Sequence, residues 1–524
     1  MYFTERKGNT TSKQKNAAVA GALGIIFRNF AQLRIPVMQA GGCGINSMID
    51  YTKMRTMPEL KQEDINRLVD REILHHISAA ADELRCECYM VGGCVRDLLL
   101  GNLSRDIHVL VVAGSGIQVA KAVASRLGDA ELSAAKGTEA AKLSLPQGTV
   151  YFSGATALDD DLYNRDFTIN AIAVSLNTDH FGEIVDPLDG RADLQDGIIA
   201  TPGDPDTAFH QDPLRMLRCI RFAATLKFQI EDETFAALER QREEIKRAGS
   251  DRVAGELNKI MMSATPSRGL VELQRCGLLQ LIMPELAALD VVETKNGRSH
   301  KNNFYHTLEV TDNVAAGSDN LWLRWAALLH DIGKPLCKRW DAAAGWTFHN
   351  HNYIGAKLIR PMFRRMKLPL DDRMKYVQKL VDLHMRPIVI ADEEVTDSAV
   401  RRLLHDAGED INDLMTLCEA DITSRNEVKK KNFLRNFALV RQKLKEIEEK
   451  DHIRNFQPPV GGEEIMSLFH LPPCREVGIL KAELKEAVLS GSVPNEHDAA
   501  LAFVVNTARK LFPELDVSLD ASES

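Results

Sequence analysis

The sequence lacks three features that would place it in a broad class at once: a basic net charge, paired cysteines and a long apolar run. Its 65 Lys and Arg against 74 Asp and Glu give a net charge of −9, so any RNA contact must depend on local patches. The nine cysteines include no C-x-x-C pair, which favours reduced thiols in a cytoplasmic protein over a zinc site. No segment is long and apolar enough to predict a transmembrane helix, so we expect no membrane contact.

Residues 1–57 fit none of the patterns found further along the chain. Lys13 and Lys15 precede an apolar run at 17–27, which superficially resembles a signal peptide. Arg28 interrupts the run, however, and no convincing cleavage site follows. We interpret this segment as a disordered extension. The full length of 524 residues predicts three or four domains. Its 44% hydrophobic and 27% charged residues are typical of a soluble globular protein.

The stretch YMVGGCVRDLLLGNLSRDIHVLVV, residues 89–112, predicts a strand, a glycine turn, a short helix and a second strand. Gly92 and Gly93 lack a Cβ, so their backbone N–H groups can approach a phosphate closely. Asp106 and His108 are two residues apart on the second strand, and they therefore point to the same face, beside the glycine turn. This arrangement places a carboxylate where a metal bound to a triphosphate would lie.

Three further blocks follow in order: NRDFTINAIAVSL at 164–176, a D-P-x-x-G-x-x-D-L connector at 186–194, and HQDPLRMLRCIRFAATLKF at 210–228. In the third, Asp212 and Arg215 are three residues apart, which would put them on one face of a helix. One carboxylate acceptor beside one guanidinium donor is complementary to the edge of cytosine or adenine, whereas guanine and uracil present the opposite pattern. The side chains of Asp212 and Arg215 could therefore select the incoming base and act as a template made of protein.

In this order the blocks resemble the class II tRNA nucleotidyltransferase and poly(A) polymerase family, from about Ile65 to about Leu286. The resemblance implies an α/β nucleotidyltransferase head at 58–200 and an all-α, RNA-binding neck at 201–292. It implies transfer of CMP and AMP from CTP and ATP to the 3′ end of tRNA, with Asp106 holding Mg²⁺ and Asp106 and His108 at the catalytic position. The nucleotide-binding residues that it implies are Gly92, Gly93, Arg96, Arg165, Asp166, Asp212, Arg215 and Arg218.

A second constellation lies beyond a polar segment at 293–303. Histidines and aspartates stand in or at the ends of separate helical segments, so that a helix bundle could bring them to one centre. These residues are His306, His330, Asp331, His351, His384 and Asp421. Imidazole and carboxylate ligands suit one or two divalent transition ions better than magnesium alone.

The order H, HD, H, H, D resembles the HD phosphohydrolase superfamily, which implies an all-α domain at 293–428. Lys334 resembles the lysine of an HD-x-x-K variant and would hold a phosphate. His351 is preferred over His349 because it begins the H-x-x-x-G-A pattern. The tail, 429–524, begins with a charged helix at 429–450 that we expect to be solvated, and it ends in a helical hairpin. The whole chain is predicted to be mainly helical.

The head departs from the family pattern at several positions. His108 replaces the second aspartate of D-x-D, Tyr151 stands where relatives often have an acid, and Gln211 also replaces an acid. In the family, two carboxylates hold paired magnesium ions. A neutral imidazole removes one negative charge, and magnesium prefers oxygen ligands, so a more imidazole-tolerant ion such as Mn²⁺ is the alternative.

Three functional readings follow from these patterns. In the first, the chain adds CMP and AMP to tRNA and carries an HD phosphohydrolase. In the second, an impaired head grips RNA, and only the HD centre performs chemistry. In the third, which the intact HD ligand set disfavours, both centres are defunct and the chain is an RNA-binding scaffold. The choice between C and A, the HD substrate and the oligomeric state stay open at this stage.

Overall fold

The computed structural model describes residues 71–128, 130–134, 137, 139–392, 396–423, 426–451, 458–513 and 515. All of them belong to the unit Arg55–Ser524. The extension expected at 1–57 lies outside the described residues. The first described helix is α3, Glu72–Leu84, which buries Leu74 and Ile77.

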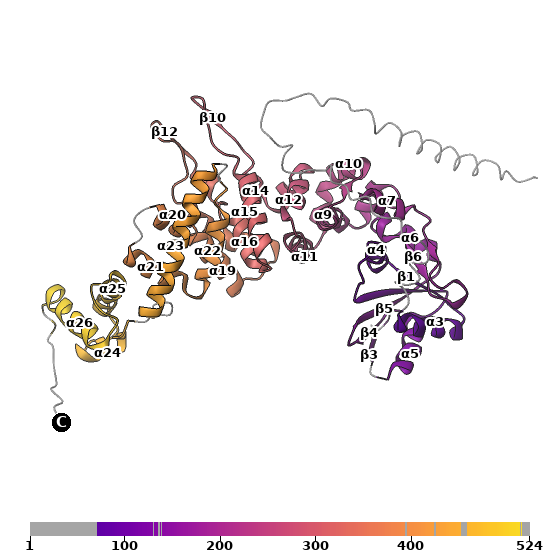
Figure 1. Ribbon diagram of the computed structural model, residues 1–524, viewed down its shortest axis with the longest axis horizontal. Helices are drawn as coiled ribbons and strands as arrows, with labels where there is room; N and C mark the ends of the chain where they lie inside the picture. Colours follow the sequence, from indigo (N-terminus) through magenta and orange to yellow (C-terminus); the bar gives the residue numbers. More distant parts are fainter. Residues whose placement is uncertain are drawn as a thin grey trace, which may run out of the picture. The chain divides into compact units, whose positions relative to one another are not determined.

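A seven-stranded sheet organises the head, with strand order β3-β4-β5-β2-β1-β6-β7 (Figure 1). Only β2 and β5 pair in parallel, and the other neighbours are antiparallel. Helices α3 and α5, Gly116–Leu127, pack together. The strands are β1 Glu87–Val91, β2 Asp106–Val112, β3 Glu131–Ala134, β4 Ala141–Leu145, β5 Gly148–Ala155, β6 Ala173–Ser175 and β7 Ile184–Val185.

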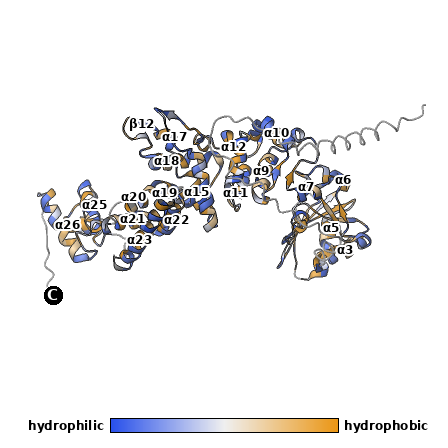
Figure 2. Ribbon diagram, turned by 45° about the horizontal axis from the view of Figure 1, so that its top comes forward, coloured by the Kyte–Doolittle hydropathy of each residue, from blue (hydrophilic) through white to orange (hydrophobic). Residues whose placement is uncertain are grey.

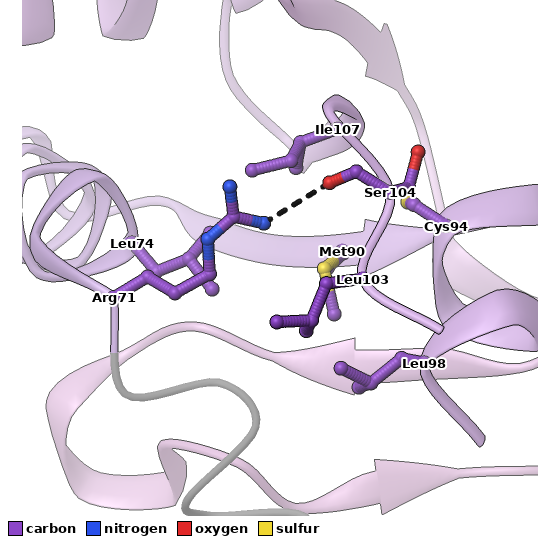
Figure 3. A pocket seen from close by; sticks show the side chains of 8 residues that line it. All are labelled: Arg71, Leu74, Met90, Cys94, Leu98, Leu103, Ser104 and Ile107. Carbon is purple, nitrogen blue, oxygen red and sulfur yellow. Dashed lines mark hydrogen bonds between the residues drawn. The ribbon is translucent and has the colours of Figure 1, made fainter. Parts of the chain in front are cut away.

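The glycine turn joins β1 to helix α4, Gly93–Leu99. On β2, exposed Asp106 and His108 alternate with buried Ile107 and Val109, which confirms the face predicted from the two-residue period. Figure 3 shows the other side of this strand, where a cavity of about 10 Å³ has room for one water at most. There Arg71 Nη1 donates to the Ser104 carbonyl at 3.3 Å (Figure 3), so the loop that leads into Asp106 is tied to the start of α3.

The segment predicted to be a helical neck is helical, but it is divided into several short helices. Its helices, with those that precede it, are α6 Leu158–Tyr163, α7 Gly190–Asp196, α8 Pro205–Gln211, α9 Leu214–Leu226, α10 Asp232–Gln241, α11 Ser250–Met261, α12 Pro266–Arg275, α13 Leu278–Ile282 and α14 Pro284–Ala287. The second half of the connector at 186–194 belongs to α7. Asp186 accepts from the N–H groups of Gly190 and Arg191 at 2.8 and 2.9 Å and so starts this helix.

The HD region is helical apart from two short hairpins that the sequence analysis did not predict. These hairpins pair β10 Thr294–Lys295 with β11 Arg298–Ser299, and β12 Arg339–Asp341 with β13 Gly345–Thr347. The helices are α15 Asn303–Gly317, α16 Leu321–Leu329, α17 Lys334–Cys337, α18 His351–Met366, α19 Asp372–Leu383, α20 Met385–Asp392, α21 Asp397–Ala407 and α22 Ile411–Ala420.

The tail begins with α23, Glu427–Asp451, where a charged helix was predicted. The expectation that it presents only a solvated face is wrong, because Phe437 and Val440 are fully buried where α23 packs on α20 and α21. Three helices follow in place of the expected hairpin: α24 Gly462–Leu468, α25 Arg475–Ser490 and α26 His497–Leu511. Figure 2 shows hydrophobic and hydrophilic residues mixed along these helices. No described helix combines the length and hydropathy that crossing a bilayer requires.

Helices on either side of residue 292 share one core. Arg324 of α16 is only 2% exposed, and its Nη1 donates to the carbonyls of Met261 and Ser263, at the end of α11, at 2.8 and 3.0 Å. Trp325 Nε1 donates to Asn258 Oδ1 of α11 at 2.9 Å. A buried guanidinium left without acceptors is costly, so the neck and the HD helices stabilise one another. Experiments on either region should therefore use the full chain.

Candidate functional site

The glycine turn of the head lies directly against β2. Cys94 Sγ accepts from the backbone N–H of His108 at 3.4 Å, which fixes the turn beside the exposed face of the strand. Gly92 has φ +80°, and a Cβ there would lie 2.6 Å from Arg165 Nη1, whereas a Cβ on Gly93 would meet nothing closer than 3.5 Å. The structure therefore brings Gly92, Arg165 and His108 together, and Asp106 starts the same face of β2.

Arg165 supplies positive charge beside Gly92 and His108. Its Nε and Nη2 lie 2.7 and 2.6 Å from Oδ2 of Asp161, which orients the guanidinium. Partial desolvation and the charge of Arg165 lower the pKa of His108 below its ordinary value, against the opposing influence of Asp106. His108 is therefore a neutral imidazole at pH 7.

Two of the head positions that depart from the family pattern, His108 and Tyr151, contact each other. In the parallel pairing of β2 and β5, His108 lies opposite Tyr151, and the two rings stack with centroids 4.8 Å apart and planes 13° from parallel. Asp106 lies opposite Thr149. Because β2 and β5 contain no other carboxylate, Asp106 is the single anionic ligand that these two strands offer a metal.

Asp166 and Arg96 belong to a network behind the glycine turn. Asp166 Oδ1 accepts from the Phe167 N–H at 3.0 Å and from Asn170 Nδ2 at 2.9 Å. Arg96 Nη1 donates to Asn170 Oδ1 at 2.9 Å, and its Nε and Nη2 donate to Asp97. The Arg96 side chain is 11% exposed. Arg96 therefore holds Asn170, and through it Asp166, in position.

The proposed base-reading pair lies close to this network, although not as a helical pair. Asp212 has extended backbone angles between α8 and α9, with Pro213 as the N-cap of α9, so the argument from a shared helix face is wrong at this residue. Its Oδ1 accepts from the Leu214 N–H at 3.2 Å. Arg215 Nη2 donates to the Asn164 carbonyl at 2.6 Å. This bond holds the Arg215 guanidinium against the residue that precedes Arg165.

Arginines on α9 and α11 complete the cluster. Arg218 Nη1 lies 3.9 Å from both Asp166 and Asp212, and Arg252 Nη2 lies 3.6 Å from Asp212. Arg252 was not predicted from the sequence as part of this cluster, because a helix and a turn separate it from the arginine-rich block. Arg221, by contrast, pairs with Glu256 at 2.6 Å and helps join α9 to α11.

The HD residues meet at one centre, as predicted. Two groups of possible metal ligands form, each with ligand atoms within 4.8 Å of one another: His306, His330 and Asp421, and Asp331, His351 and His384. Asp331 connects the groups, because its Oδ2 lies 3.4 Å from His330 Nε2 and its Oδ1 lies 3.3 Å from His351 Nε2. A carboxylate shared in this way suits a centre of two ions.

The hydrogen bonds of three histidines favour the tautomer that can bind a cation. Nδ1 of His330, His351 and His384 lies 2.7–2.8 Å from a backbone carbonyl three residues earlier in each case. A carbonyl only accepts, so each Nδ1 carries the hydrogen and each Nε2 presents a lone pair to the centre. The buried His330 Nε2 has no hydrogen-bond partner among the described residues, and the Nε2 atoms of His351 and His384 face each other at 3.3 Å. A bound cation would satisfy these acceptors.

The electrostatics of the centre favour a positive charge at this position, which a proton on His330 Nε2 would supply in the absence of a metal ion. Burial disfavours charge on His330, but Asp331 and Asp421 outweigh it and raise its pKa to about 10. Burial and the neighbouring His330 lower the pKa of His384 to about 3. Despite burial, the histidines hold the pKa values of Asp331 and Asp421 below their ordinary range. The ionised carboxylates therefore create a site of negative charge in a buried position.

Two lysines border the centre. Lys334 Nζ lies 2.5 Å from Asp331 Oδ2, at the position predicted to hold a phosphate. Lys301, which the sequence analysis missed inside the polar boundary segment, has its Nζ 3.0 Å from His306 Nδ1 and 2.7 Å from Thr423 Oγ1. Gly333 allows the HD turn to approach α18, because a Cβ there would lie 2.2 Å from the His351 carbonyl.

Comparison with protein families matches three consecutive regions. Residues 88–149 and 138–200 match the Poly A polymerase head domain. Residues 227–289 match the probable RNA and SrmB-binding site of polymerase A, and residues 303–426 match the HD domain.

Curated relatives extend over most of the chain. An A-adding tRNA nucleotidyltransferase of Deinococcus radiodurans is 32% identical over 437 residues, covering 80% of this chain and 95% of that protein. A multifunctional CCA protein of Vibrio vulnificus is 30% identical over 360 residues, covering 65% and 86%. Among solved structures, a CCA-adding enzyme in apo form I has a TM-score of 0.59 at 22% identity over 85% of this chain and 96% of its own. The Thermotoga maritima CCA-adding enzyme complexed with tRNA has a TM-score of 0.56 at 21% identity over 87% and 100%.

Proposed function

This chain belongs to the class II CCA-adding enzyme and poly(A) polymerase family, with a head, an RNA-binding body and an HD domain, and on that premise we propose its function. The head adds CMP and AMP from CTP and ATP to the 3′ end of tRNA, and the HD domain hydrolyses phosphoesters. The names of the relatives support tRNA as the partner. The eight described cysteines are free thiols, which supports a reducing, cytoplasmic location.

We assign residues 58–200 to the head, 201–292 to the neck, 293–428 to the HD domain and 429–524 to the tail. The family matches, which end at residue 200 and begin again at 227 and 303, support these divisions. The shared core around Arg324 means that the boundary at 292 divides functions and not independently folding units.

The head proposal is carried by one observation: the base-reading residues are joined to the phosphate site. Arg215 is hydrogen-bonded to the carbonyl of Asn164, and the next residue, Arg165, lies over Gly92. Asp212 and Arg215 would pair with the edge of cytosine or adenine. The glycine turn and Arg165 would then bind the phosphates, while Asp166 and Arg218 would contact the sugar side. A base and a triphosphate could thus be read together within one rigid cluster.

Asp106 is the residue that would hold a divalent ion in the head, with the neutral His108 beside it. Magnesium is the expected ion, and manganese is the alternative that tolerates an imidazole. When bound, such an ion would neutralise charge on the triphosphate and on the leaving pyrophosphate. The chain itself supplies the positive charge of Arg165 and the orientation of the base.

In the HD domain, the six histidine and aspartate side chains would hold one or two transition ions, for which imidazole ligands are suited. A bound ion would polarise a phosphoryl oxygen and provide hydroxide from water. Lys334 would stabilise the phosphate charge beside Asp331. The carbonyl partners of the histidines keep each Nε2 available to the metal.

The test of the head is incorporation of labelled CMP and AMP into tRNA that lacks its 3′ end, with magnesium and manganese assayed separately. We expect incorporation by the wild type and its loss in Asp106→Asn, which keeps the shape of the side chain and removes its charge. The control Asp179→Asn alters an exposed carboxylate outside β2 and the glycine turn and should behave as the wild type. Absence of incorporation with both ions would contradict the proposal.

A second candidate function is favoured by the stack of His108 on Tyr151. If this pair leaves the head without a working metal site, the head binds RNA and only the HD centre performs chemistry. This candidate predicts metal-dependent phosphoester hydrolysis in a preparation that shows no transfer to tRNA. Hydrolysis that survives His330→Ala would contradict it.

A further inference from the structure

Two hairpins stand beside each other at the edge of the HD domain, labelled β10 and β12 in Figure 1. Strand β11 of the first packs on β13 of the second. Arg298 Nη1 donates to the Ala343 carbonyl at 3.0 Å, and Trp346 Nε1 donates back to the Arg298 carbonyl at 3.2 Å. Reciprocal bonds of this kind fix the two hairpins as one surface.

This surface carries a row of aromatic rings. His300 meets Trp346 and Phe348 edge-on, with centroids 5.6 and 5.7 Å apart, and Trp346 meets Trp340 at 5.2 Å. All four side chains are partly exposed and none is buried. A hairpin core would bury such rings, whereas this row keeps ring surface available to a ligand.

Cations alternate with the rings. Lys295 Nζ lies 5.5 Å from the centre of the Trp340 ring, Lys338 Nζ 5.6 Å from the Trp346 ring and Lys334 Nζ 5.8 Å from the Phe348 ring. Residues 293–301 and 334–341 together contain six basic residues and two acidic ones, in a chain whose net charge is −9. The hairpins therefore form a local positive patch.

The row begins at the metal centre. The Phe348 carbonyl accepts from His351 Nδ1 at 2.8 Å, and Lys334, which lies near the Phe348 ring, is 2.5 Å from Asp331. From there the contacts run outward through His300 and Trp346 to Trp340. A ligand bound along this row would have one end at the possible metal ligands.

We propose that the two hairpins bind the single-stranded end of an RNA, stacking its bases on the aromatic row and delivering its terminal phosphate to the HD centre. Alternating rings and cations match the alternation of bases and phosphates in a single strand. Stacking accepts any base, so the surface selects for a single-stranded end and not for sequence. The delivery step rests on the proposed phosphohydrolase function, but the binding step does not.

Binding can be measured by tryptophan fluorescence in the full chain. The four tryptophans are Trp322, Trp325, Trp340 and Trp346, so binding of RNA to the head or neck does not place a base on any of them. We expect a tetraribonucleotide to quench the fluorescence and an abasic analogue of equal charge to leave it unchanged. Equal quenching by both molecules, or by neither, would overturn the proposal.

Variants locate the effect. Trp346→Ala and Trp340→Ala should each weaken tetranucleotide binding roughly tenfold, whereas Trp322→Phe, at the opposite end of α16 from His330, should bind as the wild type. Lys295→Glu is the companion variant that leaves the rings in place, since Lys295 is exposed on β10. It should weaken binding and reduce its dependence on salt. Unchanged binding in Lys295→Glu and in both tryptophan variants would refute the proposal.

Delivery is tested by kinetics on tetranucleotides that carry a terminal phosphate at the 3′ or the 5′ end. Trp346→Ala should raise KM roughly tenfold for the end that is used, with kcat unchanged, and should not affect the abasic analogue. If no substrate is hydrolysed while base-dependent quenching persists, the phosphohydrolase function fails and the binding surface stands. If hydrolysis occurs with the same KM in wild type and Trp346→Ala, the delivery step is wrong.

Discussion

The head and the HD domain differ in how much of a metal site their side chains supply. In the HD domain, six ligand side chains converge, Asp331 connects two groups, and carbonyl partners orient three of the histidines. In the head, one exposed carboxylate, Asp106, stands beside a stacked pair of neutral rings. The residues expected to bind the nucleotide are nevertheless held in a tight network around Asn164 and Asp166. Within one domain, the residues that would bind the nucleotide can therefore keep their arrangement while the residues that would bind the metal are replaced.

The stack also indicates that His108 and Tyr151, which both replace acids of the family pattern, depend on each other. An aspartate at 108 would place its charge against the Tyr151 ring, and an acid at 151 would lie against the His108 ring. Each replacement alone leaves an unfavourable neighbour, because a carboxylate packed on a ring face meets the negative side of its quadrupole. The comparison between the two centres therefore depends on positions 108 and 151 as a pair.

The largest expected effect concerns the complete centre. His330→Ala removes a buried ligand between Asp331 and Asp421, and we expect phosphoester hydrolysis to fall by at least about 100-fold, with loss of bound metal measured in the same samples. His349→Ala is the matched control, since His349 is exposed and lies outside both ligand groups. A comparable loss in His349→Ala would show that the ligand assignment is wrong.

The second-largest expected effect concerns how the head selects the base of the incoming nucleotide. Arg215→Ala removes the donor of the base-reading pair, and a lost hydrogen bond to the base should reduce selection of CTP and ATP over UTP and GTP by roughly 10–100-fold. The measurement is incorporation, or nucleotide binding if transfer is absent. Arg240→Ala alters an exposed arginine paired with Asp206 and should leave selection intact. Unaltered selection in Arg215→Ala would remove Arg215 from the template.

A smaller effect separates the two glycines of the turn. Gly92→Ala should lower the free energy of unfolding by about 1–2 kcal/mol, because its φ of +80° is unfavourable for alanine and its Cβ would approach Arg165. Gly93 is the first residue of α4, and a Cβ there would make ordinary van der Waals contact with the Arg96 guanidinium at 3.5 Å; Gly93→Ala should therefore change stability by less than about 0.5 kcal/mol. Denaturant unfolding checks both. If Gly93→Ala nevertheless weakens binding of the triphosphate, the phosphate contact lies at Gly93.

The smallest effect is a dependence of head stability on pH. Because the pKa of His108 is lowered in the folded state, its contribution is fully present above the unfolded pKa of about 6.5 and is lost as the pH falls below that value. When the pH is lowered from 7.5 to 5.5 with a metal chelator present, the free energy of unfolding should therefore fall less in His108→Asn than in the wild type. Other histidines contribute equally to both proteins, so the difference isolates His108. Equal losses would show that the imidazole is protonated as easily in the fold as outside it.

The sequence predicted those features that depend on short-range periodicity. The alternation along β2 predicted the shared face of Asp106 and His108, and ligands at the ends of helices predicted the HD centre. It could not predict the contact of His108 with Tyr151, because that contact depends on the parallel pairing of strands more than 30 residues apart in the chain. Asp212 was misplaced because Pro213 is the N-cap of α9 and the helix begins only at Leu214. The hairpins were missed because strands of two or three residues carry no period.

The central claim is that the head retains its nucleotide-binding residues and that His108 and Tyr151 limit its rate of nucleotide transfer. The most direct measurement compares labelled CMP and AMP incorporation into tRNA lacking its 3′ end by the wild type, His108→Asp, Tyr151→Glu and the double variant, in magnesium. We predict a gain of at least about tenfold in the double variant over the wild type, with a smaller gain in either single variant. No gain in the double variant, with tRNA and CTP still bound, would contradict the claim.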